Sequence, residues 1–264
     1  MRTLFRVFRI VILLIIFAAL AFYTKTQKLK SRSWSESLQL VIYPVNGENT
    51  PDIEEYIKQL DGDVFSEIDQ FFINEAKHYS LGIEQPTITR LGETIQIRPP
   101  TAPTPDSSFI EIIWWSLKFR YWAYKNTPDD ESNLHRVRIF LLYHEAEKNK
   151  LLPHSLGLDK GLLVIANVFS SPQQEQQNNI IIAHELLHTV GASDKYNAIN
   201  QPLFPDGYAE PDISPLYPQI LAEIMSAKIP LSASQSKMAE SLKLCIIGEK
   251  TAREINWIQK THKN

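Results

Sequence analysis

One stretch of the sequence, residues 172–191, restricts the possible folds more than any other. Ser171, Pro172 and Gln174 together are typical of a helix start: a capping serine, a proline at the first helical position and a capping-box partner. Gly191 supplies the left-handed residue with which many helices end. Because the second half of this stretch is apolar on nearly all sides, it predicts a buried helix over residues 172–190.

Three polar residues interrupt the apolar surface of this helix: His184, Glu185 and His188. Buried polar groups require partners. His184 and His188 are four residues apart and share a face, so both imidazoles can bind one metal ion. Seven His and nineteen Glu in 264 residues would produce this HExxH spacing by chance only roughly 0.01 times. The pattern therefore predicts a Zn2+ site at which Glu185 activates a zinc-bound water.

The third metal ligand has three candidates, Asp194, Glu210 and Glu223. Asp194 is favoured because Gly191 ends the helix and lets the chain turn back, which brings residue 194 within reach of a metal held by the helix. A simple turn role for Asp194 is the alternative.

The pattern His184-Glu185-x-x-His188-x-x-Gly191-x-x-Asp194 resembles the motif of the metzincin zinc peptidases, HExxHxxGxxH or, in some members, HExxHxxGxxD. The resemblance implies a zincin-like catalytic domain in which a mixed sheet lies above the active-site helix. It also implies that an extended peptide or protein substrate lies along a cleft. The motif resemblance covers residues 184–194 and, more weakly, 223–230.

Metzincins also have a Met-turn, in which a methionine packs beneath the zinc. Met225 in the sequence EIMSAKIPL fits this role better than that of an ordinary core methionine. Some branches place a tyrosine two residues after this methionine, where it helps to hold the transition state. This chain has Ala227 there, and the substitutes that we consider are Tyr196, Tyr208 and Tyr217.

The rest of the body predicts an α+β fold, with a mixed β-sheet packed with helices. The expected strands are residues 38–45, 93–98, 136–143 and 161–169, and the expected helices are residues 51–60, 63–80 and 109–125. Two further helices are expected in the C-terminal part, separated at Gly248, with Met238 in the first and the lone Cys245 in the core.

Two segments of the body have open interpretations. The helix at 109–125 is apolar on two sides, which favours complete burial over a surface that faces a partner or lipid. The segment 197–222 is long and contains five prolines, and we expect it to wall the cleft or to form a solvated surface loop.

The N-terminus contains fourteen consecutive apolar residues, 10–23, preceded by Arg2, Arg6 and Arg9. This pattern predicts a hydrophobic helix that is an uncleaved signal-anchor, with a removed signal peptide or a buried helix as alternatives. Accordingly, we expect residues 1–32 to be the signal-anchor or signal peptide and residues 33–264 to form a metzincin-like zinc peptidase domain. A single-pass membrane protein with an extracytoplasmic catalytic domain is expected, or a secreted protein if the segment is cleaved.

The charge of the chain is uneven, and this bears on its partners. Residues 1–32 carry seven Lys or Arg and no acidic residue, which leaves 20 basic and 30 acidic side chains for the rest. Such an acidic body predicts no nucleic-acid partner. The expected function is a zinc metalloendopeptidase, and the alternatives are a membrane-anchored protein with non-catalytic zinc or a zinc amidase that acts on cell-wall peptides.

Overall fold

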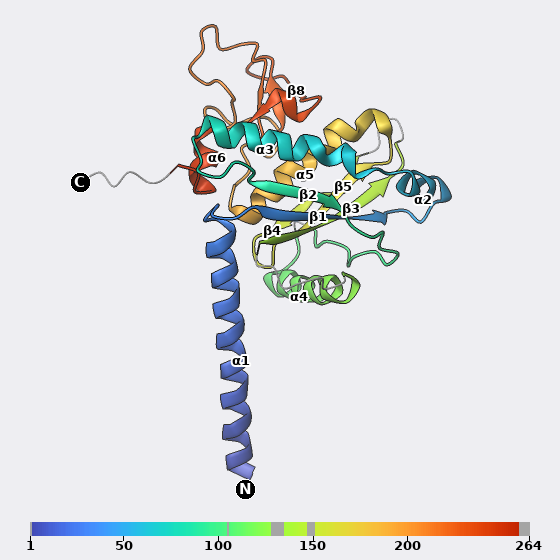
Figure 1. Cartoon of the computed structure of the whole chain (residues 1–264), viewed down its shortest axis with the longest axis vertical. Helices are drawn as coiled ribbons and strands as arrows, with labels where there is room; N and C mark the ends of the chain where they lie inside the picture. Colours follow the sequence, from blue (N-terminus) through green and yellow to red (C-terminus); the bar gives the residue numbers. More distant parts are fainter. Residues whose placement is uncertain (1, 105, 128–134, 147–150, 259–264) are drawn as a thin grey trace, which may run out of the picture.

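A five-stranded mixed sheet organises the body of the chain (Figure 1). The computed structural model describes residues 2–104, 106–127, 135–146 and 151–258. The strand order is β2-β1-β3-β5-β4, with the first four strands parallel and β4 antiparallel at one edge. The strands are β1 (Leu38–Asn46), β2 (Thr87–Leu91), β3 (Arg136–His144), β4 (Leu156–Leu158) and β5 (Leu163–Phe169).

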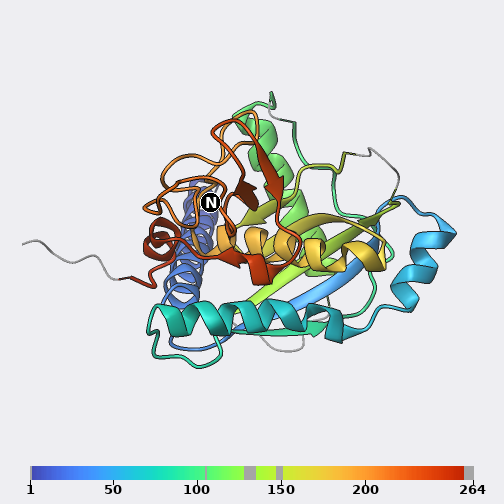
Figure 2. The same ribbon diagram turned by 90° about the horizontal axis from the view of Figure 1, so that it is seen from above.

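Helices cover both faces of the sheet (Figure 2). One face packs against α2 (Pro51–Lys58), α3 (Ser66–His78) and α5 (Glu175–Val190), and the other packs against α4 (Phe109–Asn126). The central strands β3 and β5 are buried on both faces, which is why their sequences are nearly continuous apolar runs. The α+β architecture with a mixed sheet is confirmed.

The predicted strand at residues 93–98 is wrong. The strand that pairs with β1 at this edge of the sheet is β2, and within 93–98 only Ile95 forms a bridge, to Val45. The cause lies in α3, where Asp69 accepts hydrogen bonds from the side chains of Thr87 and Thr89 and from the backbone N–H of Thr89. These bonds fix β2 in the sheet.

The C-terminal part is mostly not helical, which corrects the first of the two helices expected there. It contains two short pairings, β6 (Ala222–Glu223) with β9 (Cys245–Ile246) and β7 (Lys228–Pro230) with β8 (Ser236–Met238). Met238 is therefore in a strand. The second expected helix exists as α6 (Glu249–Glu254), and Cys245 is buried as expected.

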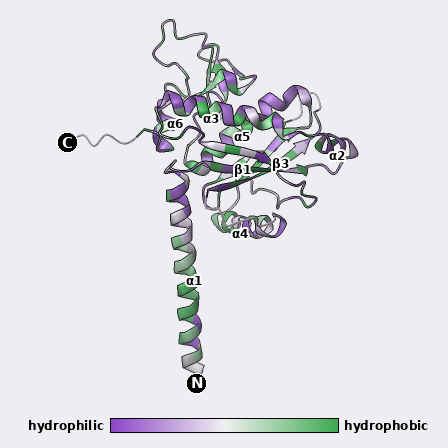
Figure 3. Cartoon of the chain, in the orientation of Figure 1, coloured by the Kyte–Doolittle hydropathy of each residue, from purple (hydrophilic) through white to green (hydrophobic). Residues whose placement is uncertain are grey.

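The N-terminal helix α1 (Arg2–Ser31) projects from the body (Figure 1). It is long and apolar enough to cross a membrane, and none of its most hydrophobic window is buried. The alternative of a buried N-terminal helix is therefore wrong. Figure 3 shows that the hydrophobic part of α1 is followed by a hydrophilic end where it meets the body. Gln27 and Ser31 at that end are buried.

The helix α4 is buried on one side only, so the expectation of complete burial is wrong. Trp115, Phe119, Trp122 and Ala123 pack on the sheet. The other apolar stripe faces outward and is exposed, as its member Trp114 illustrates with 60% of its surface accessible.

Candidate metal centre

The helix that carries the site is α5, which begins with a 3-10 turn at Pro172–Gln174 and ends at Gly191. The capping box expected at Ser171 is absent, since the Ser171 hydroxyl donates to the Gln173 side chain. Gly191 has a φ of 108°, the left-handed conformation that the sequence predicted. The chain can therefore turn directly after Val190 and return toward the helix.

This turn brings Asp194 to both histidines. Asp194 Oδ1 lies 3.1 Å from His184 Nε2 and 3.1 Å from His188 Nε2. The two Nε2 atoms are also 3.1 Å apart. Three donor atoms from 11 residues of sequence thus form a nearly equilateral triangle.

The triangle fits the donor set of a zinc ion. Tetrahedral zinc with bonds of about 2.0–2.1 Å separates its ligand atoms by roughly 3.3 Å, close to the distances found here. The second ring nitrogens support this assignment, because His184 Nδ1 faces the carbonyl oxygen of Ile224 at 3.1 Å and His188 Nδ1 faces that of Ala192 at 2.9 Å. A carbonyl only accepts, so each Nδ1 carries a proton. In the neutral rings that bind a metal, both Nε2 lone pairs then point into the triangle, whereas in the protonated rings Nε2 donates to Asp194.

Glu185 lies beside the triangle without being part of it. The ligand atoms of His184, Glu185 and His188 lie within 4.8 Å of one another. Glu185 is buried, and its Oε2 atom has no hydrogen-bond partner. Burial raises the pKa of this carboxyl group, and the nearby charges of His184 and His188 partly oppose that rise. An unpartnered carboxylate oxygen at a metal site is suited to accept a proton from a water molecule.

The charge of Asp194 is stabilised by its neighbours. Burial alone would raise the pKa of this carboxyl group, but the hydrogen bonds from His184 and His188 and their charges hold it well below its usual range. Asp194 is therefore ionised at neutral pH, which is the state that a metal ligand requires.

An ion pair between the buried Lys195 and the half-buried Glu254 holds the backbone on either side of Asp194. Lys195 is 3% exposed, and its Nζ donates to Glu254 Oε2 at 2.8 Å and to the carbonyl and hydroxyl oxygens of Ser193. Glu254, on α6, also accepts from the backbone N–H and the hydroxyl of Ser193. The sequence reasoning missed both residues of this pair. Lys195 is adjacent to the motif, but no sequence signal connects it with Glu254.

The turn that contains Met225 contacts the site through the Ile224 carbonyl oxygen, which faces His184 Nδ1. Met225 is fully buried, and its carbonyl oxygen accepts from the Lys195 backbone N–H at 3.0 Å. Glu223 braces this turn through the N–H of Met225, and it also accepts from Gly248 and Thr251. Glu223, a candidate third ligand, thus has its carboxylate engaged in the fold.

Tyr196 is the tyrosine that the structure places at the site. Its ring stacks with that of His184 at a centroid distance of 6.3 Å. Burial, then the charge of Asp194 and a hydrogen bond to it, raise the pKa of Tyr196 to about 12. The hydroxyls of Tyr208 and Tyr217 instead bond to each other at 2.8 Å.

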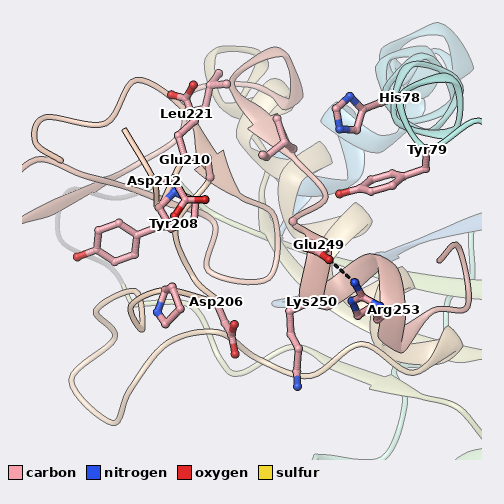
Figure 4. A pocket seen from close by; sticks show the side chains of 15 residues that line it. His78, Tyr79, Asp206, Tyr208, Glu210, Asp212, Leu221, Glu249, Lys250 and Arg253 are labelled. Carbon is pink, nitrogen blue, oxygen red and sulfur yellow. Dashed lines mark hydrogen bonds and ion pairs between the residues drawn. The ribbon is translucent and has the colours of Figure 1, made fainter. Parts of the chain in front are cut away.

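Two pockets differ in their relation to these residues. The larger, about 700 Å³, lies between the 205–212 segment, α3 and α6, and its lining includes His78 but neither His184 nor His188 (Figure 4). Glu210, another candidate third ligand, is part of this lining, and the ion pair between Glu249 and Arg253 lies across from it. A second pocket of about 460 Å³ includes His188 and Gly191. Of the two pockets, the second adjoins the candidate metal centre, because His188 is part of its lining.

The edge strand β4 lies directly against the site. A Cβ atom added to Gly157 would come within 2.3 Å of the Glu185 carbonyl oxygen and 2.7 Å of His188 Cβ. Only glycine allows this close approach of strand and helix. The sequence analysis assigned no role to Gly157, because a single glycine in a short segment has no distinctive pattern.

No known protein family model and no curated protein sequence matches the chain.

Proposed function

We propose that the protein is a zinc-dependent endopeptidase of the metzincin type, with His184, His188 and Asp194 as the zinc ligands. The observation that carries this proposal is the triangle of two Nε2 atoms and one carboxylate oxygen with sides of 3.1 Å. The unpartnered Oε2 of Glu185 beside it supports catalysis over a purely structural metal, because a structural site has no use for such a group.

In the proposed peptide hydrolysis, Glu185 and Tyr196 have separate roles. Zinc, when bound, supplies a Lewis acid that lowers the pKa of water and polarises the peptide carbonyl. Glu185 accepts a proton from the attacking water as the new C–O bond forms, and then delivers it to the nitrogen of the leaving amine as the C–N bond breaks. We propose that Tyr196, whose raised pKa keeps it protonated, exchanges its hydrogen bond to Asp194 for one to the oxygen that gains negative charge.

The substrate class follows from the edge strand β4. This strand is paired on one side with β5, and no second strand among the described residues is paired with it. An extended peptide can add to such an edge through its backbone, with little demand on side-chain sequence. Gly157 in this strand contacts the helix beside His188, so a peptide bound there passes the metal. A polypeptide substrate in extended conformation is therefore favoured.

The membrane segment belongs to the same proposal. We propose that α1 is an uncleaved signal-anchor, with the arginines at its start on the cytoplasmic side and the body on the opposite side. Removal of α1 as a signal peptide is the alternative. The mass of the mature N-terminus distinguishes the two.

The test uses the full-length protein in detergent micelles, incubated with a peptide library and with peptidoglycan, with and without a zinc chelator. Cleavage of peptides that the chelator abolishes is expected. Release of cell-wall fragments alone would indicate the amidase, and bound zinc without turnover would indicate a non-catalytic protein.

Replacement of the general base gives the matched variant. Glu185→Gln keeps the volume of the side chain and leaves the three ligands intact, but it cannot accept the proton. We expect peptide cleavage to fall by about 10²–10⁴-fold, while the zinc content is unchanged. Undiminished cleavage in this variant would refute the mechanism.

A further inference from the structure

The outer face of α4 is an exposed apolar surface. It consists of eight large side chains whose exposed fractions range from 43% to 77%: Phe109, Ile110, Ile112, Ile113, Trp114, Leu117, Tyr121 and Tyr124. Apart from α1, no described helix or strand exposes as many. A contiguous apolar surface of this kind marks an interaction site, since single exposed hydrophobic residues are the normal situation.

The position of α1 identifies what covers this face. Gln27 and Ser31 are buried against the body. No exposed linker therefore separates the lipid-accessible part of α1 from the body. A membrane crossed by α1 therefore begins at the body itself. Figure 1 shows that α1 projects on the side of the sheet that α4 covers, and α4 is the outermost layer there. The outer face of α4 thus points toward the same membrane.

Polar contacts connect the end of α1 with α4. Asp159 forms an ion pair with Lys28 of α1 at 3.1 Å. The next residue, Lys160, accepts two hydrogen bonds at its carbonyl oxygen from the guanidinium group of Arg120 on α4, at 3.2 and 3.0 Å. The segment at 159–160 thus ties α4 to the end of α1. The position of α4 relative to α1 is therefore fixed by the contacts of this segment.

The composition of α4 matches the interface of a bilayer. Trp and Tyr are enriched at the level of lipid headgroups, where one end of the side chain is apolar and the other is wet. The exposed Trp114 has Lys118 Nζ 5.6 Å from its ring centre, and Lys125 follows at the end of the helix. The helix thus combines an apolar face with cationic residues that suit anionic phospholipids.

We propose that the outer face of α4 inserts into the headgroup region of the phospholipid bilayer that α1 crosses, so that the body has two membrane contacts. The inference rests on the proposed membrane attachment through α1 and is independent of the zinc chemistry. Since Arg32 and Arg120 line the pocket that contains His188, this contact also holds the metal site next to the lipid surface.

Tryptophan fluorescence tests the contact in the full-length chain. The protein is reconstituted in vesicles that contain phosphatidylglycerol and lipids brominated on the upper acyl chain. Trp114 is 60% exposed, whereas the other four tryptophans are at most 8% exposed. We expect bromine quenching in the unmodified chain, loss of most of it in Trp114→Phe, and no loss in the control Trp257→Phe. Absence of quenching in the unmodified chain would overturn the proposal.

Spin labels separate the failure of this contact from the failure of the anchor. Cysteines replace Leu117 on α4, Ile15 on α1 and Ser234 in the β7–β8 hairpin, on the far side of the sheet (Figure 1), in a Cys245→Ala background. The quantity measured is the ratio of each label's accessibility to oxygen, which concentrates in lipid, to its accessibility to a water-soluble nickel reagent. This ratio should be high at positions 15 and 117 and low at position 234.

Three other outcomes would contradict the proposal. A label at 117 that behaves like the label at 234, with 15 still in lipid, would disprove the α4 contact alone. Broadening of the spectrum of the label at 117 by the same label on another copy of the chain would show that this second copy covers the outer face. If position 15 is also accessible to nickel, the membrane attachment itself fails.

Discussion

Asp194 shows how the proposed chemistry depends on individual side chains. Its carboxylate reaches two histidines at 3.1 Å, and their hydrogen bonds keep it ionised despite burial. The residues on either side of it are held by Glu254, from 60 residues further along the chain. The position of this ligand is thus set by contacts that lie outside the motif.

The contacts of Glu254 with Ser193 and Lys195 predict a pH dependence of stability. Burial would raise the pKa of Glu254, but the hydrogen bonds from Lys195 and Ser193 lower it below its ordinary value. A carboxyl group whose pKa is depressed in the folded state stabilises the protein above its unfolded pKa, and the effect is lost as the pH falls through the folded pKa. Glu254→Gln should therefore lower the free energy of unfolding by about 1.5–3 kcal/mol at neutral pH, and by less below pH 4.

Denaturant unfolding of both proteins over this pH range measures the difference. Glu249→Gln is the control, since Glu249 lies on the same helix and its ion pair with Arg253 is exposed. It should change the free energy of unfolding by less than about 0.5 kcal/mol. A pH-independent difference for Glu254→Gln would contradict the account.

At the residue scale, the sequence could predict the parts of the site that are local. His184, Glu185, His188 and Asp194 lie within 11 residues, and helical spacing with one glycine turn is enough to bring three of them together. Their assignment as zinc ligands and base stays a prediction. Glu254 could not be predicted, because its contact with Ser193 depends on how α6 packs in three dimensions.

The end of α5 is the element on which the site depends. Gly191 has a φ of 108°, and a Cβ atom there would also lie 2.4 Å from the Arg32 guanidinium carbon. Gly191→Ala should cost about 1–2 kcal/mol of stability and lower the zinc affinity, because Asp194 is displaced.

Thermal unfolding and zinc titration measure the two effects. Gly82→Ala is a matched control, since nothing lies within 4 Å of its added Cβ atom. An equal effect of the two substitutions would contradict the role of Gly191.

The elements that sequence patterns did not predict share a physical cause. Residues 93–98 alternate as a strand should, but the strand that pairs with β1 is selected by the hydrogen bonds of Asp69 to Thr87 and Thr89. Met238, Leu242 and Cys245 have helical spacing, but the segment is divided between pairings with β7 and β6. Tertiary contacts outweigh local pattern in both places. The strands β1, β3 and β5 were predictable because their apolar runs are long.

At the scale of the whole molecule, the candidate metal centre joins parts that are distant in sequence. It lies where α5, the edge strand β4 and the turn with Met225 meet. A bound ion would connect the end of α5 with the turn at Asp194, and β4 and the Met225 turn pack around this junction, so its removal should lower the stability of the folded body.

A chelator should lower the melting temperature of the full-length protein. A ligand present at 100 times its Kd contributes about 2.7 kcal/mol, and each kcal/mol changes the Tm of a domain of this size by about 2–4 °C, so we expect a decrease of at least about 5 °C. His188→Ala lacks one ligand and should show no response to the chelator. A chelator effect of the same size in both proteins would exclude this site as its origin.

X-ray absorption at the zinc edge of the purified full-length protein tests the central claim most directly. The account predicts one zinc per chain, bound by two imidazole nitrogens and a carboxylate oxygen at about 2.0–2.2 Å, with one further light-atom ligand from solvent. A chain that retains no zinc, or a zinc shell with fewer than two imidazoles or with sulfur, would contradict it.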